Sequence, residues 1–305
     1  MESEFIDWLT QRLPPLSDLD IGIGDDAAVI DISSSDRLVV TTDLLVDGVH
    51  FAWQTVEPQQ VGHKAVAVNL SDLAAMAARP IALVVAVAVP DDVEIEALQA
   101  MIEGMLTLAE RFDAPIVGGD TNRTEGPLTI SITAMGTTLP KGPLTRAGAM
   151  PGDWVLVTGE FGGSILGRHL DFIPRVHEAI ALHERYTLHA GIDVSDGLTL
   201  DLSRLAARSE CGAELDLERI PIAAAAVQLA QQENDQQSPL QHALSDGEDF
   251  ELLLAVPPSE AQKMLSAQPL DVPLSHIGSI VAQPGLWQLD ASGRRQPLPP
   301  RGYEH

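Results

Sequence analysis

The sequence predicts a two-domain protein of the α/β or α+β class, because helical and strand patterns alternate along both halves of its 305 residues. Residues 81–89 form a valine-rich apolar run between two prolines, which is typical of a buried strand. Residues 93–112 carry apolar side chains at close to a 3.6-residue period and predict a helix. The chain length agrees with two domains of roughly 100–200 residues each.

The remaining patterns place further elements in chain order. Residues 2–13 predict a short amphipathic helix that ends at two prolines, and Pro58 opens a helical pattern that continues to about residue 78. We expect strands at residues 27–32, 37–42, 115–117, 128–136 and 154–158. A segment rich in Gly and Pro precedes the last of these strands, so we predict a first domain of residues 1–147 and a second of residues 148–305.

The acidic composition excludes several classes of partner. The formal net charge is −26, and nucleic acids and anionic membranes bind proteins through Lys and Arg, so we expect neither partner. The longest apolar run is far shorter than the roughly 20 residues of a membrane helix. One cysteine, Cys211, cannot form an intrachain disulfide, and the N-terminus lacks the pattern of a signal peptide, so we expect a cytoplasmic protein.

Aspartates recur beside glycines where strands are expected to end. In GIGDDAA, residues 22–28, two glycines allow a tight turn that brings two carboxylates to the mouth of a strand, although an ordinary acidic turn also explains the motif. In TTDLLVDGVHF, residues 41–51, Thr41 and Asp43 share one strand face and offer oxygen ligands that suit Mg²⁺. His50 in the same motif is a candidate hydrogen-bond partner of a phosphate or a ring, or an ordinary histidine of a solvated turn.

A third aspartate lies on a predicted helix. In NLSDLAAMAARP, residues 69–80, Asp72 falls on the same helical face as Val61, Ala65 and Val68. A buried carboxylate is costly unless it is paired or binds a metal ion. Asp72 is therefore a candidate metal ligand, and a salt bridge to Lys64 is the alternative explanation.

Three more motifs follow the same pattern. VGGDTNR, residues 117–123, combines glycine N–H groups with Asp120 as a candidate phosphate cradle, or it is a plain Gly-Gly turn. In GIDVSDGL, residues 191–198, Asp193 and Ser195 share a strand face, while Ser195 or Asp196 is also a candidate N-cap of the next helix. In SDGEDFELLLAV, residues 245–256, Glu248 and Asp249 precede a buried strand, for which a solvated acidic turn is the simplest interpretation.

The conjunction of these motifs is more specific than any one of them. Six acidic, glycine-bearing turns in one acidic chain indicate a single site that holds several divalent cations and a polyphosphate. The P-loop, the protein-kinase catalytic loop and the dinucleotide fingerprint are all missing from the sequence. An EF-hand calcium loop is missing as well, which argues against a calcium-binding protein.

In this order, together with RAGAMPGDWVLVTG at residues 146–159, the motifs resemble those of the thiamine-monophosphate kinase family, within the PurM-like superfamily of aminoimidazole ribonucleotide synthetase. The resemblance covers about residues 21–303. It implies an N-terminal α/β domain whose mixed sheet pairs with its twin in a homodimer, and a C-terminal α+β domain. It also implies ATP as co-substrate, several Mg²⁺ ions per site, and in-line transfer of phosphate to thiamine monophosphate.

The resemblance carries roles to individual residues. The positions that match metal ligands are Asp26, Thr41, Thr42, Asp43, Asp72, Asp120, Asp193 and Asp196. The positions that match ATP contacts are Gly119, Asp120, Arg146 and Ser195, and those that match thiamine monophosphate contacts are His50, Glu248 and Tyr303. Catalysis is expected to depend on Asp43, Asp120 and Arg146.

The chain departs from the family pattern in the second half. The segment after Phe161 is shorter than usual, the PxPR-like element is reduced to Ile-Pro-Arg at residues 173–175, and the usual GGED reads DGED at residues 246–249. Two rival functions remain open at this point. One is another ATP-dependent synthetase of the superfamily, although a selenophosphate synthetase would need a Cys or Sec near the N-terminus. The other is a non-catalytic paralogue that binds nucleotide or thiamine phosphate.

Overall fold

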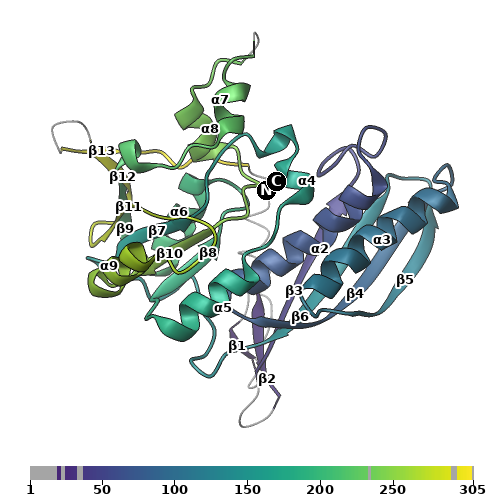
Figure 1. Ribbon diagram of the computed structural model, residues 1–305, viewed down its shortest axis with the longest axis horizontal. Coiled ribbons are helices and arrows are strands. Elements are labelled where there is room, and N and C mark those ends of the chain that lie inside the picture. Colours follow the sequence, from purple (N-terminus) through teal and green to yellow (C-terminus); the bar gives the residue numbers. More distant parts are fainter. Residues whose placement is uncertain (1–18, 22–24, 33–36, 233–234, 290–293, 304–305) are drawn as a thin grey trace.

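The computed structural model describes residues 19–21, 25–32, 37–232, 235–289 and 294–303, which form two β-sheets with helices packed on them (Figure 1). The first half contains β1 (Leu19–Ile21), β2 (Ala28–Asp31), β3 (Arg37–Val46), α2 (Pro58–Ala75), β4 (Arg79–Pro90), α3 (Ile95–Arg111), β5 (Ile116–Thr124) and β6 (Thr129–Thr137). The second half begins with β7 (Trp154–Thr158), η1 (Ser164–Leu166), α4 (Arg168–Asp171), α5 (Val176–Arg185), β8 (Ala190–Asp193), α6 (Leu198–Arg208) and β9 (Gly212–Leu215). It continues with η2 (Leu217–Arg219), α7 (Ala224–Leu229), α8 (Pro239–Ser245), β10 (Leu252–Val256), α9 (Pro258–Ala267), β11 (Leu274–Val281), β12 (Gly285–Leu289) and β13 (Arg295–Pro297).

The first sheet is mixed and carries its helices on one face. Its strand order is β1-β2-β3-β6-β4-β5, and the β4–β5 pair is parallel while the others are antiparallel. Helices α2 and α3 lie side by side over this sheet (Figure 1). Side chains alternate between buried and more accessible along β3 and β6, as expected where one face of a sheet is covered.

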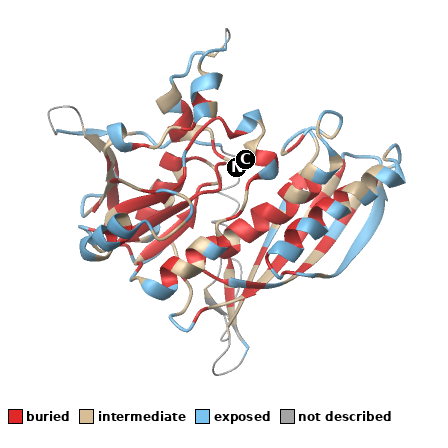
Figure 2. Cartoon of the chain, in the orientation of Figure 1, coloured by how far each residue is buried: buried red, intermediate tan, exposed pale blue. Residues whose placement is uncertain are grey.

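Helix α2 connects the two halves of the molecule. Pro58 stands at its first turn, where a missing N–H costs no hydrogen bond, and 13 of its 18 residues are buried. Figure 2 shows α2 as an almost continuous buried helix between the first sheet and the second half. One apolar core accordingly includes Val61 and Leu70 of α2 together with Leu156 of β7 and Leu254 of β10. A helix that is buried nearly all round is the packing centre of the fold.

The second sheet has the order β13-β12-β9-β11-β7-β10-β8, with β12 and β9 parallel. A second apolar core lies within this half and includes Leu202 and Leu205 of α6 with Val157 and Leu253. The strand β8 leads directly through a short connection into α6. The polar residues of that connection therefore lie at the edge of the sheet, next to α2.

The α/β and α+β class predicted from the sequence is confirmed, and so is the strand at residues 154–158. The expected helix at residues 58–78 ends at Ala75, because the chain turns through a left-handed residue at Ala77 (φ 49°). The helix expected at residues 2–13 lies outside the described residues. The predicted boundary between residues 147 and 148 falls in the connection from β6 to β7 and remains a prediction.

One local prediction was wrong. The strand expected at residues 115–117 continues to Thr124, so Gly118, Gly119 and Asp120 lie inside β5 and not in a turn after it. The reason is a close approach between strands: a Cβ atom at Gly119 would lie 1.9 Å from the carbonyl oxygen of Val85 in β4. Glycine is needed there for space and not for a turn.

Among the described residues, no helix has both the length and the apolar character of a membrane span.

We predict that Gly119→Ala destabilises the fold by about 1–3 kcal/mol, because the new methyl group meets the β4 backbone, which cannot yield as a side chain would. Thermal and denaturant unfolding of the purified variant measure the loss. Gly118→Ala is the matched control in the same strand, since a Cβ atom there meets nothing within 4 Å. Equal stabilities of the two variants would contradict this explanation of Gly119.

Candidate active site

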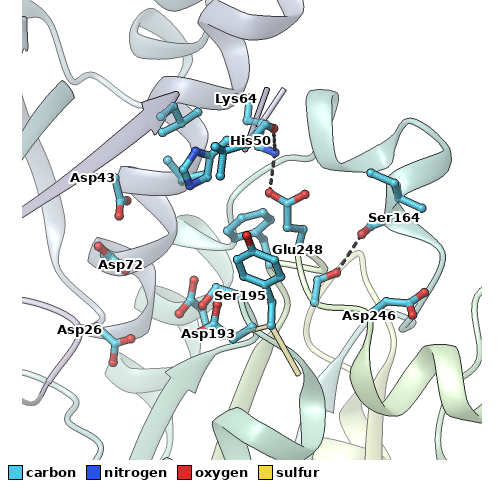
Figure 3. Close-up of a pocket in the computed structure, with 18 of the residues that line it drawn as sticks. Asp26, Asp43, His50, Lys64, Asp72, Ser164, Asp193, Ser195, Asp246 and Glu248 are labelled. Carbon is cyan, nitrogen blue, oxygen red and sulfur yellow. Dashed lines mark hydrogen bonds and ion pairs between the residues drawn. The ribbon is translucent and has the colours of Figure 1, made fainter. Parts of the chain in front are cut away.

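A cavity of about 740 Å³ lies where the two halves meet. Its walls come from β3 and α2 on one side, and from the β8–α6 connection and the loop before β10 on the other (Figure 3). Tyr303 also lines the cavity, and its backbone N–H donates to the carbonyl oxygen of Asp196 at 2.9 Å. Most residues predicted from the sequence to bind metal or substrate line this cavity: Asp26, Thr41, Thr42, Asp43, His50, Asp72, Arg146, Asp193, Ser195, Asp196, Glu248 and Tyr303. Segments more than 250 residues apart in the chain thus meet in one site.

Three carboxylates converge at one end of the cavity. Oxygen atoms of Asp26, Asp72 and Asp193 all lie within 4.8 Å of one another. They come from the segment before β2, from α2 and from the end of β8, and Figure 3 shows them facing a common space beneath Asp43. Asp26 and Asp193 are buried and Asp72 is half-buried. Such a set of hard oxygen ligands suits a divalent cation such as Mg²⁺.

Hydroxyl groups hold two of these carboxylates in place. Thr41 Oγ1 donates a hydrogen bond of 2.5 Å to Asp72, and Ser71 Oγ donates one of 2.5 Å to Asp193. The neighbouring Asn69 accepts a hydrogen bond from the backbone N–H of Asp43 at 3.1 Å. The polar side chains of the NLSD motif, Asn69, Ser71 and Asp72, therefore contact strands β3 and β8. The hydrogen bonds from Thr41 and Ser71 restrict the rotamers of Asp72 and Asp193.

The electrostatics of this cluster are unfavourable to several negative charges. Burial raises the pKa of Asp72 well above its ordinary value, and the charges of Asp43 and Asp193 raise it further. Burial also raises the pKa of Asp193, with the charge of Asp26 as the next cause. For Asp25, burial and then the charge of Asp26 raise the pKa to about 6. A bound cation removes this penalty, because it favours the ionised form of each carboxylate.

Arg146 pairs with one carboxylate of this cluster. Its guanidinium donates to both oxygens of Asp26, from Nη2 at 2.6 Å and from Nε at 2.9 Å. Burial opposes its charge, but the charge and hydrogen bonds of Asp26 prevail and raise its pKa above the ordinary value. One arginine against three carboxylates leaves the cluster with excess negative charge.

Lys64 pairs with Glu248 and not with Asp72, which was the alternative left open by the sequence. Its Nζ is 2.5 Å from Glu248 Oε1 and donates to the carbonyl oxygen of His50 at 2.6 Å. The Lys64 side chain is 1% exposed, and burial lowers its pKa, with Glu248 as the opposing influence. The ion pair joins α2 to the loop before β10 across the cavity (Figure 3). Lys64 thereby connects His50 and Glu248, the two residues predicted to contact the substrate on either side of it.

The loop before β10 is held in a strained conformation. Glu248 and Phe250 have left-handed backbones, with φ of 54° and 50°, and Glu248 N–H donates to the Ser195 carbonyl oxygen at 2.6 Å.

Asp249 is 2% exposed and pairs with Arg168, so the interpretation of this segment as a solvated acidic turn was wrong. Arg175, from the reduced Ile-Pro-Arg element, donates to both oxygens of Glu251 at 2.6 and 2.7 Å.

The Ser195–Asp196 segment does not cap α6, although the sequence left that role open. The N-cap residue is Gly197, with no side-chain cap. Asp201 of α6 instead accepts hydrogen bonds from the N–H groups of Asp196 and Gly197, at 2.9 and 3.1 Å. The side chain of Asp196 pairs with Arg204.

Gly119 and Asp120 are not brought to the cavity. One row of paired residues runs across four neighbouring strands of the first sheet. It contains Asp120 of β5, Ala86 of β4, Ser131 of β6 and Leu44 of β3. Residues in one such row point to the same face of a sheet. Leu44, Ala86 and Asp120 are all exposed, so this row lies on the face that α2 and α3 leave uncovered.

Sequence reasoning missed several residues of the site. Ser71 and Asn69 lie beside the predicted ligand Asp72, so polar side chains within an otherwise apolar helix were a usable signal. Asp25 was recognised as one of the two carboxylates of GIGDDAA but was given no role of its own. Arg204 lies eight residues after Asp196 and lines the cavity. The sequence around Arg204 does not indicate a site residue, since an arginine on a helix is ordinarily exposed to solvent.

We predict that Glu248→Gln destabilises the protein by about 3 kcal/mol at neutral pH, because it leaves the buried Lys64 without a counter-charge. The pKa of Lys64 then falls further below its value in the unfolded chain. Between these two pKa values the unfolded chain binds the extra proton, so stability rises with pH, and the loss should shrink as pH approaches 10. Denaturant unfolding from pH 6 to 10 measures this dependence.

Glu260→Gln is the control for that experiment, since Glu260 pairs with Lys263, whose side chain is 66% exposed. It should change stability little at any pH. A pH-independent loss in Glu248→Gln would show that the ion pair is not the cause.

Comparisons with known proteins agree with this architecture. The family described as AIR synthase related protein, N-terminal domain, matches residues 24–138, and the corresponding C-terminal domain matches residues 150–286. The thiamine-monophosphate kinase of Rhodopirellula baltica is 44% identical over 312 residues, which covers 100% of this chain and 97% of the relative. That of Escherichia coli K12 is 38% identical over 86% of this chain and 82% of its own length.

A solved structure supports the same assignment. The complex named AaThiL complexed with AMPPCP and TMP superposes with a TM-score of 0.85 at 27% identity, covering 100% of this chain and 96% of that one. Fold, full-length sequence similarity and the matched domain families therefore agree, and this chain belongs to the thiamine-monophosphate kinase family.

Proposed function

We propose that this chain phosphorylates thiamine monophosphate to thiamine diphosphate with ATP as the donor. The observation that carries the proposal is the cavity itself. It has a carboxylate cluster at one end and the predicted substrate residues His50, Glu248 and Tyr303 elsewhere in its wall. Its volume of about 740 Å³ is within the range of cavities that enclose organic ligands.

The carboxylate cluster fits Mg²⁺. Asp26, Asp72 and Asp193 would hold it, with Asp43 and Thr41 beside them, because their oxygens converge and their burial disfavours uncompensated charge. Several bound Mg²⁺ ions would screen the repulsion between two phosphate-bearing substrates. The cluster has three carboxylates and one arginine partner, and this excess of negative charge supports the binding of more than one Mg²⁺ ion.

The residues of the chain would act by position and charge. The acceptor is a phosphate oxygen that is already anionic near neutral pH, so no general base has to remove a proton. Arg146, fixed by Asp26, would supply a positive charge beside the transferring group. Asp43 and Ser195 line opposite walls and would align the donor for direct in-line transfer without a phosphoenzyme.

The substrate end of the cavity suits a cationic heteroaromatic group. Glu248 offers a carboxylate whose Oε1 is held by Lys64, and Tyr303 contributes an aromatic ring to the same wall. A thiazolium ring carries a positive charge that a carboxylate and an aromatic face both attract. Lys64 would act here as a positioning residue, because it holds Glu248 and the His50 backbone together.

The uncovered face of the first sheet supports a homodimer that completes the site. Asp120 points to this face, away from the helices, together with exposed Leu44 and Ala86. Among the residues that the structure describes, β2 pairs with β3 from Arg37 to Val40, and the part of β3 that lines the cavity lies beyond this pairing. A second copy packed on this face would bring its Asp120 and Gly119 to that part of β3. The cytoplasmic location expected from the sequence remains a prediction.

We predict that purified protein forms thiamine diphosphate from ATP, Mg²⁺ and thiamine monophosphate, and that Asp43→Asn lowers kcat by at least about 100-fold, since it removes a charge from the metal and phosphate end. Chromatography of the products measures turnover, and EDTA should abolish it. Asp92→Asn, at an exposed site after β4, is the control and should keep wild-type activity. A folded protein that binds ATP but forms no thiamine diphosphate would refute the proposed reaction.

We further predict that two inactive variants, Asp43→Asn and Asp120→Asn, regain activity when mixed and allowed to exchange subunits. Each mixed dimer then contains one site with both native aspartates. The rate of thiamine diphosphate formation after mixing measures the recovered activity, and the molecular mass in solution shows whether the protein is a dimer. If both aspartates serve the same subunit, every site in the mixture stays defective and no activity returns.

A further inference from the structure

Arg204 occupies the corner of the cavity where the family resemblance implies a metal ligand. Its Nη1 pairs with Asp196, and the same nitrogen donates to Asp201 Oδ1 at 2.9 Å. The Asp196 side chain is 18% exposed and that of Asp201 is 1% exposed. The guanidinium therefore already neutralises Asp196 at the point where a cation would have to bind.

Asp201 anchors Arg204 in this place. It accepts hydrogen bonds from the N–H groups of Asp196 and Gly197, so it is fixed at the start of α6. Moving Arg204 away would leave a carboxylate that is 1% exposed without its counter-charge, which is a costly state.

The Arg146–Asp26 pair at the other end differs in this respect. Asp26 belongs to the three-carboxylate cluster, where a metal ion can take over the neutralisation of Asp26 from Arg146. Asp196 is outside that cluster, and Arg204 has a second, buried partner that a metal ion at Asp196 does not replace. The two corners therefore favour different cations: a metal ion near Asp26 and the guanidinium at Asp196.

Arg204 also has hydrogen-bonding capacity left for a ligand. Its Nη1 makes both ion pairs, and the described residues show no partner for Nε or Nη2. The side chain is 36% exposed and lines the same cavity as Ser195 and Tyr303. A planar guanidinium with unused N–H groups is well suited to phosphate oxygens.

We propose that Arg204 stands in for a metal ion at Asp196 and donates to a phosphate oxygen of ATP, so that Asp196 holds an arginine and not Mg²⁺ in this chain. The proposal rests on the proposed function in one respect, which is that ATP enters this cavity. It gives the site two kinds of cation for one polyphosphate, and it assigns Arg204 a direct contact with substrate.

The test compares Arg204→Ala with the wild type by two binding measurements that need no acceptor. Calorimetry in EDTA gives the metal-free Kd of ATP, and Mn²⁺ titration followed by electron paramagnetic resonance counts bound metal in the presence of ATP. We expect metal-free ATP binding to weaken roughly 10- to 100-fold, which is the effect of one charge-assisted contact. We expect the variant to bind one more Mn²⁺ than the wild type, because Asp196 becomes available.

Two further variants keep the test decisive. Asp201→Asn combined with Arg204→Ala removes the buried charge along with its partner, so a loss of folding in the single variant does not obscure the result. Arg208→Ala, one turn further along α6 at an exposed position, is the matched control and should change neither quantity. Unchanged metal-free ATP affinity and unchanged Mn²⁺ count in the folded double variant would overturn the proposal. A failure to phosphorylate thiamine monophosphate would leave these binding results intact and refute the proposed reaction alone.

Discussion

The rest of the structure depends on the need to compensate carboxylates that are buried together. Asp26, Asp72 and Asp193 lie within 4.8 Å of one another in a chain of net charge −26. Isolated ions of this kind are not tolerated in a protein interior, so each needs a hydroxyl, an arginine, a proton or a metal ion. The hydroxyls come from Thr41 and Ser71, and the arginine is Arg146. The remaining charge makes the cavity a site for cations and for the phosphates that accompany them.

The fold can bring these groups together because α2 is shared by both halves. The helix presents Lys64 and Asp72 to the same cavity about two turns apart, Asp72 toward the carboxylate cluster and Lys64 toward the loop before β10. Its burial against β3 and β6 on one side and α4, α5 and β8 on the other fixes the distance between these two ends of the cavity. The carboxylate end and the Glu248 end of the site are thus spaced by about two turns of one rigid helix.

Much of this arrangement could be predicted from the sequence, and the reasons are local. The strand at residues 154–158 and the buried face of the helix with Asp72 follow from periodicity, and acidic turns beside glycines indicated the cavity wall. What could not be predicted depends on contacts between distant segments. The partner of Lys64 lies 184 residues away, and the reason for Gly119 is a carbonyl oxygen on another strand. The role of Asp249 likewise depends on Arg168, 81 residues earlier.

The shared helix has a consequence for how the molecule unfolds. Although the chain has two sheets and matches two domain families, its larger apolar core continues from the first sheet through α2 into β7, β10 and α5. Separating the halves at their connecting segment would expose one side of α2 to water and strip the second sheet of part of its core. We therefore expect the two halves to unfold together as one cooperative unit, and neither half to fold stably without the other.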